Sequence, residues 1–237
     1  QRLEIIHQHG IKNVRVLDRT FNFNPRRAKE LLQLFQEFHP HIRFHLEIHP
    51  ALLSEDLKTE LQQLPEGLLH LEAGIQSLRE PVLEKCKRLG KLNDALEGLQ
   101  FDNMETHADL IAGLPLYRLN EVFEDIRILA EFQAGEIQLE SLKLLPGTDM
   151  RRRANELGIQ YSPMPPYEVL RTEDITPEEL QVARRLSRLL DAFYNTPAWQ
   201  SLTRELILND TTFLHHFLDY LTEANLIDQP MSLEKRG

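Results

Sequence analysis

The chain has 237 residues, of which 41% are hydrophobic and 27% are charged, and this composition suits one or two globular domains with a substantial core. Its formal net charge of −10 does not favour a non-specific nucleic-acid surface. The single cysteine, Cys86, excludes a disulfide framework within the chain and a metal cluster held by cysteines of this chain alone. No apolar run approaches the ~20 residues that span a membrane and no secretory signal is visible, so the cytoplasm is the expected compartment.

Strand and helix patterns alternate through the first 150 residues. Short apolar or alternating runs predict strands at 14–17, 42–48, 69–73, 106–112 and 137–143. Amphipathic patterns and capping residues predict helices at 25–38, after Ser54, and at 80–87, 92–101 and 120–133. Repeated strand–helix units indicate an α/β fold with a parallel sheet, and we expect a partial (β/α) barrel of the TIM type.

The organising stretch is residues 69–77, which we expect to be a buried strand that breaks at Gly74 and places Gln76 and Ser77 in the loop beyond. Every predicted strand also carries a carboxylate near its end. These groups are Asp18, Glu47, Glu72, Asp109 and Glu140. In a parallel barrel the carboxyl ends of the strands share one face, so these groups could form one site, although any one of them could instead be a helix cap or an ion-pair partner.

The character of the chain changes after residue 150. The proline-rich segment 162–167 excludes a regular helix or a central strand. Helical patterns follow at 177–195, 198–208 and 211–225, the first of them capped by Thr176. We therefore expect a partial barrel over 1–150 and a helical C-terminal region over 151–237.

Two other kinds of chemistry are considered from the residues alone. His45 and His49 flank Glu47 on one strand face, which would suit a histidine-dependent metal hydrolase on a barrel. The spacing is weak for zinc and the alternative is a set of half-buried structural histidines, so no metal ligand is assigned. Cys86 is expected to be a packed side chain, because no feature of its surroundings marks a lowered pKa.

Four segments resemble the successive barrel-strand motifs of the radical S-adenosylmethionine (radical SAM) superfamily. They are DRTFN at 18–22, EIHP at 47–50, EAGIQS at 72–77 and DLIAGLP at 109–115. The nearest subgroup is the cobalamin-binding class that includes the anaerobic magnesium-protoporphyrin ester cyclases. The segment PPYEVL at 165–170 and the helices after it resemble the C-terminal region of that class.

The resemblance implies an S-adenosylmethionine site at the strand ends. It places Asp18, Thr20 and Glu47 at the amino group of the methionine moiety, and Arg88 at its carboxylate. Gln76, with Ser77 beside it, and Asp109 would contact the ribose, while Ile111, Ala112 and Gly113 would lie behind the adenine. The chemistry is consistent, since an amino group binds carboxylates, a carboxylate binds arginine, and hydroxyls need acceptors.

The departure from the superfamily is the missing C-x3-C-x2-C motif, which binds a 4Fe-4S cluster in the loop after the first strand. Truncation is the simplest account, with natural loss as the alternative, and it would leave a sheet edge beside Val14–Leu17 open to pairing with a second copy. We expect the intact enzyme to cleave S-adenosylmethionine reductively, with cobalamin, for methyl transfer or oxidative ring formation on a small-molecule substrate. This fragment would itself be inactive, and a cluster-free binding or interaction module is the alternative.

Overall fold

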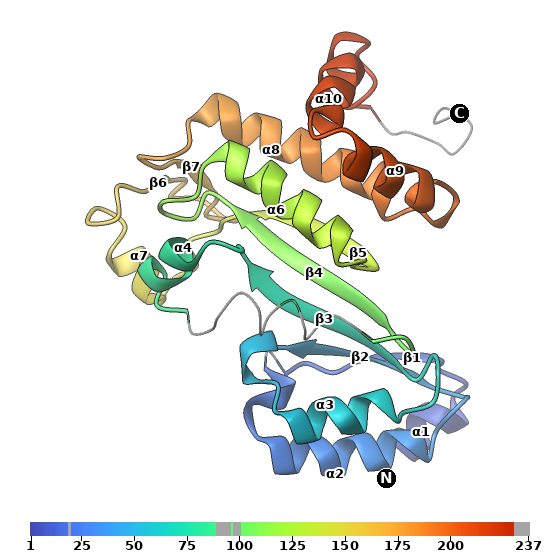
Figure 1. The fold of residues 1–237 in the computed structure, drawn as a ribbon. Coiled ribbons are helices and arrows are strands. Elements are labelled where there is room, and N and C mark those ends of the chain that lie inside the picture. Colours follow the sequence, from blue (N-terminus) through green and yellow to red (C-terminus); the bar gives the residue numbers. More distant parts are fainter. Residues whose placement is uncertain (19, 89–95, 97–100, 230–237) are drawn as a thin grey trace. The chain divides into compact units, whose positions relative to one another are not determined.

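The structure is a computed structural model that describes residues 1–18, 20–88, 96 and 101–229. Five strands form one sheet in the order β1-β2-β3-β4-β5 (Figure 1). Their bounds are Asn13–Arg15 for β1, Arg43–Ile48 for β2, Leu69–Gln76 for β3, Glu105–Ala112 for β4 and Glu136–Ser141 for β5. The sheet order follows the chain order, and helices separate the strands, so the expected α/β fold with a partial TIM-like barrel is confirmed.

The chain divides into two compact units, and each is described by itself. The described residues of unit 1 fall within Gln1–Ile75, Gly90–Ala108 and Ala134–Glu136, and those of unit 2 within Gln76–Leu89, Asp109–Gln133 and Ile137–Gly237. The boundary that we expect at residue 150 is of another kind, because it marks the change from strand–helix repeats to helices alone in the sequence. That domain boundary stays a prediction.

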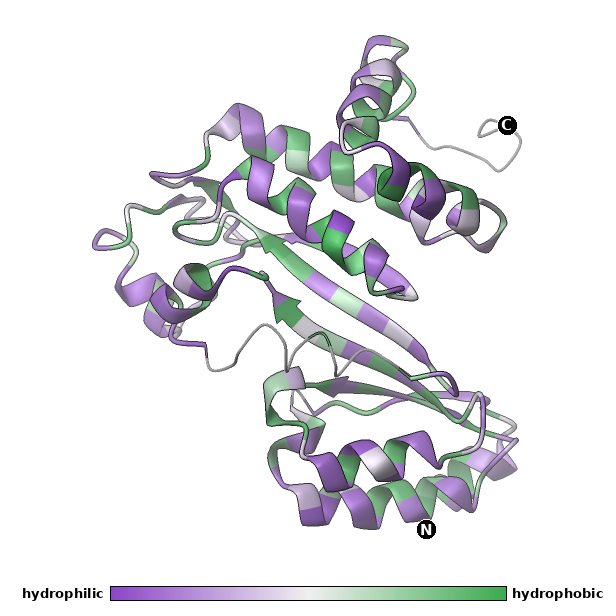
Figure 2. Cartoon of the chain, viewed as in Figure 1, coloured by the Kyte–Doolittle hydropathy of each residue, from purple (hydrophilic) through white to green (hydrophobic). Residues whose placement is uncertain are grey.

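In unit 1, β1 pairs with β2 and β2 pairs with β3, both in parallel. Burial alternates along β2, where Phe44, Leu46 and Ile48 are buried and the residues between them are half-buried. Among the described residues, this unit contains the α-helices α1 (Arg2–Gln8), α2 (Pro25–Gln36) and α3 (Glu55–Gln62). Helices α2 and α3 lie side by side, and each carries a hydrophobic and a hydrophilic face (Figure 2).

In unit 2, α6 (Leu119–Glu131) packs against α8 (Pro177–Leu189) and α9 (Pro197–Asn209) (Figure 1). The remaining elements are α4 (Glu80–Lys85), α7 (Asp149–Arg152), β6 (Gln160–Tyr161), β7 (Val169–Arg171), a π-helical turn at Leu190–Tyr194 and α10 (Phe213–Glu223). Strands β6 and β7 form a small antiparallel pair around the proline-rich segment. No helix of the described residues is long and apolar enough to cross a membrane.

The predicted ends of three strands differ from the structure, and one of them is β5, which ends at Ser141 rather than at residue 143. Strand β1 ends at Arg15, because the amide of Asp18 donates to the carbonyl of Val16 and turns the chain, which leaves Leu17 94% exposed. Strand β3 does not break at Gly74, which is buried in mid-strand, but continues to Gln76. The helix expected at 92–101 lies largely outside the described residues.

Candidate functional site

The loop after β1 carries Asp18 and Thr20 and is fastened by a buried asparagine. The side chain of Asn22 donates to the carbonyl of His49 at 2.8 Å and accepts from its amide at 2.9 Å. The carboxylate of Asp18 accepts from Arg27 at 2.6 Å and from the amide of Thr20 at 3.4 Å. The structure thus brings Asp18 and Thr20 together, and the ion pair that holds Asp18 is a partly exposed one of modest strength.

Glu47 lies in β2 as a half-buried residue, with Glu72 of β3 as its register partner. Both residues occupy the half-buried positions of their strands, which alternate with the buried apolar positions. The expectation that Glu47 shares a face with His45 therefore agrees with the observed burial pattern.

The strand β3 delivers Gln76 in a left-handed backbone conformation, with φ of 72°. The next residue, Ser77, is 1% exposed, and its hydroxyl donates to Asp125 at 3.3 Å while accepting from the amide of Arg79 at 3.1 Å. Ser77 is therefore part of the support of this turn, and Gln76 remains the half-buried member of the pair.

Asp125 of α6 is the centre of that support. Its fully buried carboxylate also accepts from the amide of Leu78 at 2.8 Å, the hydroxyl of Tyr117 at 2.6 Å and Nε of Arg79 at 2.8 Å. Burial raises the pKa of Asp125, and these donors oppose the rise. Burial likewise raises the pKa of the Tyr117 hydroxyl, which keeps it a donor. Sequence reasoning missed this network because its members are spread over two loops and a helix.

Strand β4 presents Asp109 and Ile111 at half-buried positions that alternate with the buried Ala108, Leu110 and Ala112. Gly113 follows with φ of 93°, a conformation that other residues rarely adopt. A Cβ on Gly113 would stand 3.5 Å from side chains of Leu142, Leu180 and Val169, so the glycine is required by its backbone conformation rather than by lack of space.

Arg88 follows α4 as a half-buried residue whose amide donates to the carbonyl of Leu83 at 2.8 Å. Cys86 lies two residues earlier. Burial raises the pKa of the Cys86 thiol to about 11, although Arg153 and Arg88 oppose the rise. The thiol is therefore protonated at neutral pH, in agreement with the expectation of a packed side chain.

A cluster of charged and imidazole side chains, which sequence reasoning missed, lies on one face of the strands in unit 1 and ranges from the buried His107 to the exposed Arg15 and Glu105. We call it the strand-face cluster, and its members are Arg15, Arg43, His45, His70, Glu72, Glu105, His107 and Glu136. The carboxylate of Glu72 accepts from Arg15 at 2.5 Å and lies 2.6 Å from Nε2 of His45. The ring of His45 stacks on that of His70 at 4.5 Å.

The second half of the strand-face cluster surrounds His70. Arg43 donates to Glu105 at 2.5 Å, and Nδ1 of His70 lies 3.2 Å from Arg43 and 3.4 Å from the same carboxylate. The rings of His70 and His107 meet edge to face, and Nδ1 of His107 is 3.8 Å from Glu136. Burial, followed by the neighbouring His45, lowers the pKa of His70, so its imidazole is neutral at neutral pH.

The cluster borders a cavity of about 350 Å³, lined by Arg15, Arg43, His45, His70 and two residues of β1. Its residues His70, His107 and Glu136 could hold a metal ion, because one ligand atom from each lies within 4.8 Å of the others. The pairing of His45 with His49 that the sequence suggests is not the grouping observed here.

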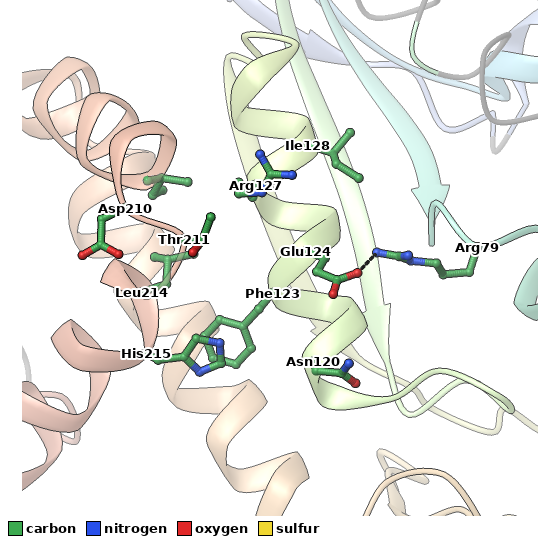
Figure 3. A pocket seen from close by; sticks show the side chains of 11 residues that line it. Arg79, Asn120, Phe123, Glu124, Arg127, Ile128, Asp210, Thr211, Leu214 and His215 are labelled. Atoms are coloured by element: carbon green, nitrogen blue, oxygen red, sulfur yellow. Dashed lines mark hydrogen bonds and ion pairs between the residues drawn. The ribbon is translucent and has the colours of Figure 1, made fainter.

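A second cavity, of about 380 Å³, lies in unit 2 between α6 and the segment that joins α9 to α10 (Figure 3). Phe123 of α6 stacks on His215 of α10, with ring centroids 3.7 Å apart. Arg79 donates to Glu124 at 2.8 Å on the opposite side of the same helix (Figure 3). The cavity is lined by positively charged, negatively charged and apolar side chains, and this mixture does not indicate one class of ligand.

Comparison with solved structures shows which known proteins share this fold. The structure of the radical S-adenosylmethionine methyltransferase TsrM from Kitasatospora setae, with cobalamin and a [4Fe-4S] cluster bound, matches with a TM-score of 0.57 and 18% identity, over 75% of this chain and 36% of TsrM. The archaeal Elp3 of Methanocaldococcus infernus matches with a TM-score of 0.54 and 15% identity, over 84% of this chain and 49% of Elp3.

The expected radical SAM fold is therefore confirmed as a fold, and the chain spans between about a third and a half of the length of these structures. A family described as a protein of unknown function, DUF4080, matches residues 155–236, which lie in the expected helical C-terminal region. Among curated proteins, none matches this sequence.

Proposed function

We propose that this chain is the S-adenosylmethionine-binding portion of a radical SAM enzyme. The observation that carries the proposal is the fold, shared with a radical SAM methyltransferase. Further support comes from the polar residues Gln76 and Asp109, which belong to one compact unit and stand in the neighbouring strands β3 and β4.

The proposal gives each residue a task that its chemistry suits. Asp18, Thr20 and Glu47 bind the amino group of the methionine moiety, because carboxylates and hydroxyls accept from an ammonium group. Arg88 pairs with its carboxylate. The remaining contacts are Gln76 and Asp109 with the ribose, supported by Ser77, and Ile111, Ala112 and Gly113 with the adenine.

The residues of this chain do not fit an iron–sulfur cluster. Such clusters need several cysteine thiolates, whereas this sequence has only Cys86, whose thiol is protonated. When bound by the whole protein, a cluster supplies the electron that cleaves S-adenosylmethionine, and cobalamin suits methyl transfer or oxidative ring formation. In this proposal those groups are held by residues outside this sequence, and the chain by itself binds without turnover.

The proposal includes a small-molecule substrate and a cytoplasmic location for the whole protein. The alternative, a binding module without redox chemistry, would show S-adenosylmethionine binding in a whole protein that contains no further cysteines. The proposed enzyme and this module differ in the sequence that the complete gene encodes before Gln1, which can be read directly.

The proposal is tested by calorimetric titration of the chain with S-adenosylmethionine, using Asp109→Ala and a control, Glu131→Ala. Glu131 is an exposed carboxylate of α6 whose recorded ion pair is with Arg127. We expect weak binding that falls about tenfold or more in Asp109→Ala, because a charge-assisted hydrogen bond contributes about 1.5–3 kcal/mol.

The control variant should bind as the native chain does, and circular dichroism would verify that both variants are folded. Equal binding by the native chain and Asp109→Ala would contradict the assignment of Asp109. If a whole protein that includes the cysteine loop also fails to bind S-adenosylmethionine, the proposal is wrong.

A further inference from the structure

We propose that His70, His107 and Glu136 form a binding site for a divalent first-row transition ion of the Zn²⁺ type, separate from the proposed S-adenosylmethionine site. One ligand atom of each residue lies within 4.8 Å of the other two. Two imidazoles and one carboxylate are a donor set that zinc and its neighbours in the first row accept. All three residues belong to unit 1, so the site is contained within one compact unit.

The sheet geometry explains why these residues meet. His70 is the second residue of β3, His107 the third of β4 and Glu136 the first of β5, and these strands are consecutive in the sheet. All three therefore lie near the amino ends of their strands, whereas the residues proposed for S-adenosylmethionine lie toward the carboxyl ends or beyond them. A rigid sheet is a precise support for ligands that come from separate strands.

His70 has a nitrogen prepared for a ligand. Its Nε2 is buried and has no hydrogen-bond partner among the described residues, which is uncommon for a buried polar atom. On the other side of the ring, Nδ1 lies 3.4 Å from the carboxylate of Glu105. Nδ1 also lies 3.2 Å from the guanidinium of Arg43, so the neutral ring has two tautomers here: one accepts from Arg43 at Nδ1, and the other donates from Nδ1 to Glu105 and leaves the lone pair on Nε2. A metal ion at Nε2 selects the second tautomer, in which a carboxylate orients the metal-bound imidazole.

The charges of the strand-face cluster favour a cation. Arg15 is paired with Glu72 and Arg43 with Glu105, so both guanidinium charges are balanced. A third carboxylate, that of Glu136, is 3.8 Å from Nδ1 of His107, which is longer than a hydrogen bond. A divalent ion between Glu136 and His107 would place a positive charge beside this carboxylate.

The geometry also indicates the coordination. Zinc binds nitrogen and carboxylate oxygen at about 2.0–2.2 Å, so the three atoms must approach one another slightly when the ion enters. Glu136 has a side chain that is 37% exposed, which gives it freedom to move and gives the ion a route from solvent. Three protein ligands leave a fourth position for water.

The site is tested on the full chain after treatment with a chelator and dialysis. Zn²⁺ is titrated by calorimetry, and Co²⁺ is titrated by visible absorption, which reports the nitrogen and oxygen ligands around cobalt. We expect one ion per chain, a visible cobalt spectrum that Zn²⁺ displaces, and a higher melting temperature with Zn²⁺, because the ion binds the folded state alone.

Three variants make the test specific. Glu136→Gln keeps the size of the side chain and should lower Zn²⁺ affinity more than tenfold. Glu105→Gln removes the orienting carboxylate and should lower it about tenfold while the cobalt spectrum remains. The control is His216→Gln, an exposed histidine of α10, which should change neither. If Zn²⁺ fails to bind at micromolar concentrations, or binds Glu136→Gln as it binds the native chain, the site does not exist.

Discussion

The turn after β3 is held by hydrogen bonds to the carboxylate of Asp125. Replacing it by asparagine keeps the volume but removes the charge opposite Arg79 and places an amide NH2 among donors. We expect the free energy of unfolding to fall by about 3 kcal/mol, because the buried donors around residue 125 lose their charged acceptor and only the exposed Glu124 still pairs with Arg79. Urea unfolding followed by circular dichroism measures this change.

The matched control for that experiment is Glu124→Gln, because Glu124 binds the same guanidinium from the surface, with a side chain that is 54% exposed. An exposed pair of this kind contributes at most about 1 kcal/mol. If the free energy of unfolding falls equally in the two variants, the buried carboxylate of Asp125 contributes no more to stability than the exposed one of Glu124.

At the same scale, the sequence reveals some functional residues and hides others. The motif that contains Gln76 is visible because its residues are contiguous. The three proposed metal ligands are hidden, since His70, His107 and Glu136 are brought together only by the pairing of three strands. A usable signal did exist: each of them occupies the face of its strand opposite the one that carries most of the apolar residues.

Among the elements, α8 illustrates a capping box that the sequence predicts and the structure contains. Thr176 accepts from the amide of Glu179 at 3.2 Å, and the Glu179 carboxylate accepts from the amide of Thr176 at 2.8 Å. Thr176→Ala should lower the free energy of unfolding by about 1 kcal/mol, whereas Thr176→Ser keeps the hydroxyl and should change it by a few tenths. Thermal melts of both variants check this, and a similar loss in each would count against the cap.

Element type was predictable along most of the chain, and element ends were less so. The period-2 pattern of β2 and the proline at the start of α2 are local signals, and they placed those elements to within two residues. The end of β3 was not predictable in this way, because a glycine after an apolar run marks a strand end in some proteins and a buried mid-strand position in others, as Gly74 does here. The early end of β1 depended on a turn between Val16 and Asp18, and no residue in this segment is typical of such a turn.

The sheet of the whole molecule ends at β1, which pairs with β2 alone in the described part of the chain. Lys12 and Val16 direct backbone groups toward β2, so by alternation the amide of Asn13 faces away. We predict that two copies associate through this edge. Sedimentation at increasing concentration should show a dimer that Asn13→Pro weakens, since proline removes the outward donor, and that Asn13→Ala retains. A monomer at every concentration would rule the edge contact out.

The fold class and the strand order were accessible at this scale because strand–helix repeats admit few topologies. The division into units was not, since it cuts through β3, β4 and β5 and leaves no composition signal. The roles assigned to the residues at the strand ends remain predictions, because they depend on contacts with S-adenosylmethionine and the local sequence pattern does not determine such contacts.

The membership of Ala134–Glu136 in unit 1 has a consequence for synthesis of the chain. A ribosome makes β1, β2 and β3 early, but the last strand segment of this unit follows the whole of α6. Until Glu136 has emerged, the nascent unit lacks this last segment, and His107 lacks its carboxylate neighbour. Unit 1 is therefore completed only after the whole of α6 has been translated, so its contacts between segments that are distant in the chain form late.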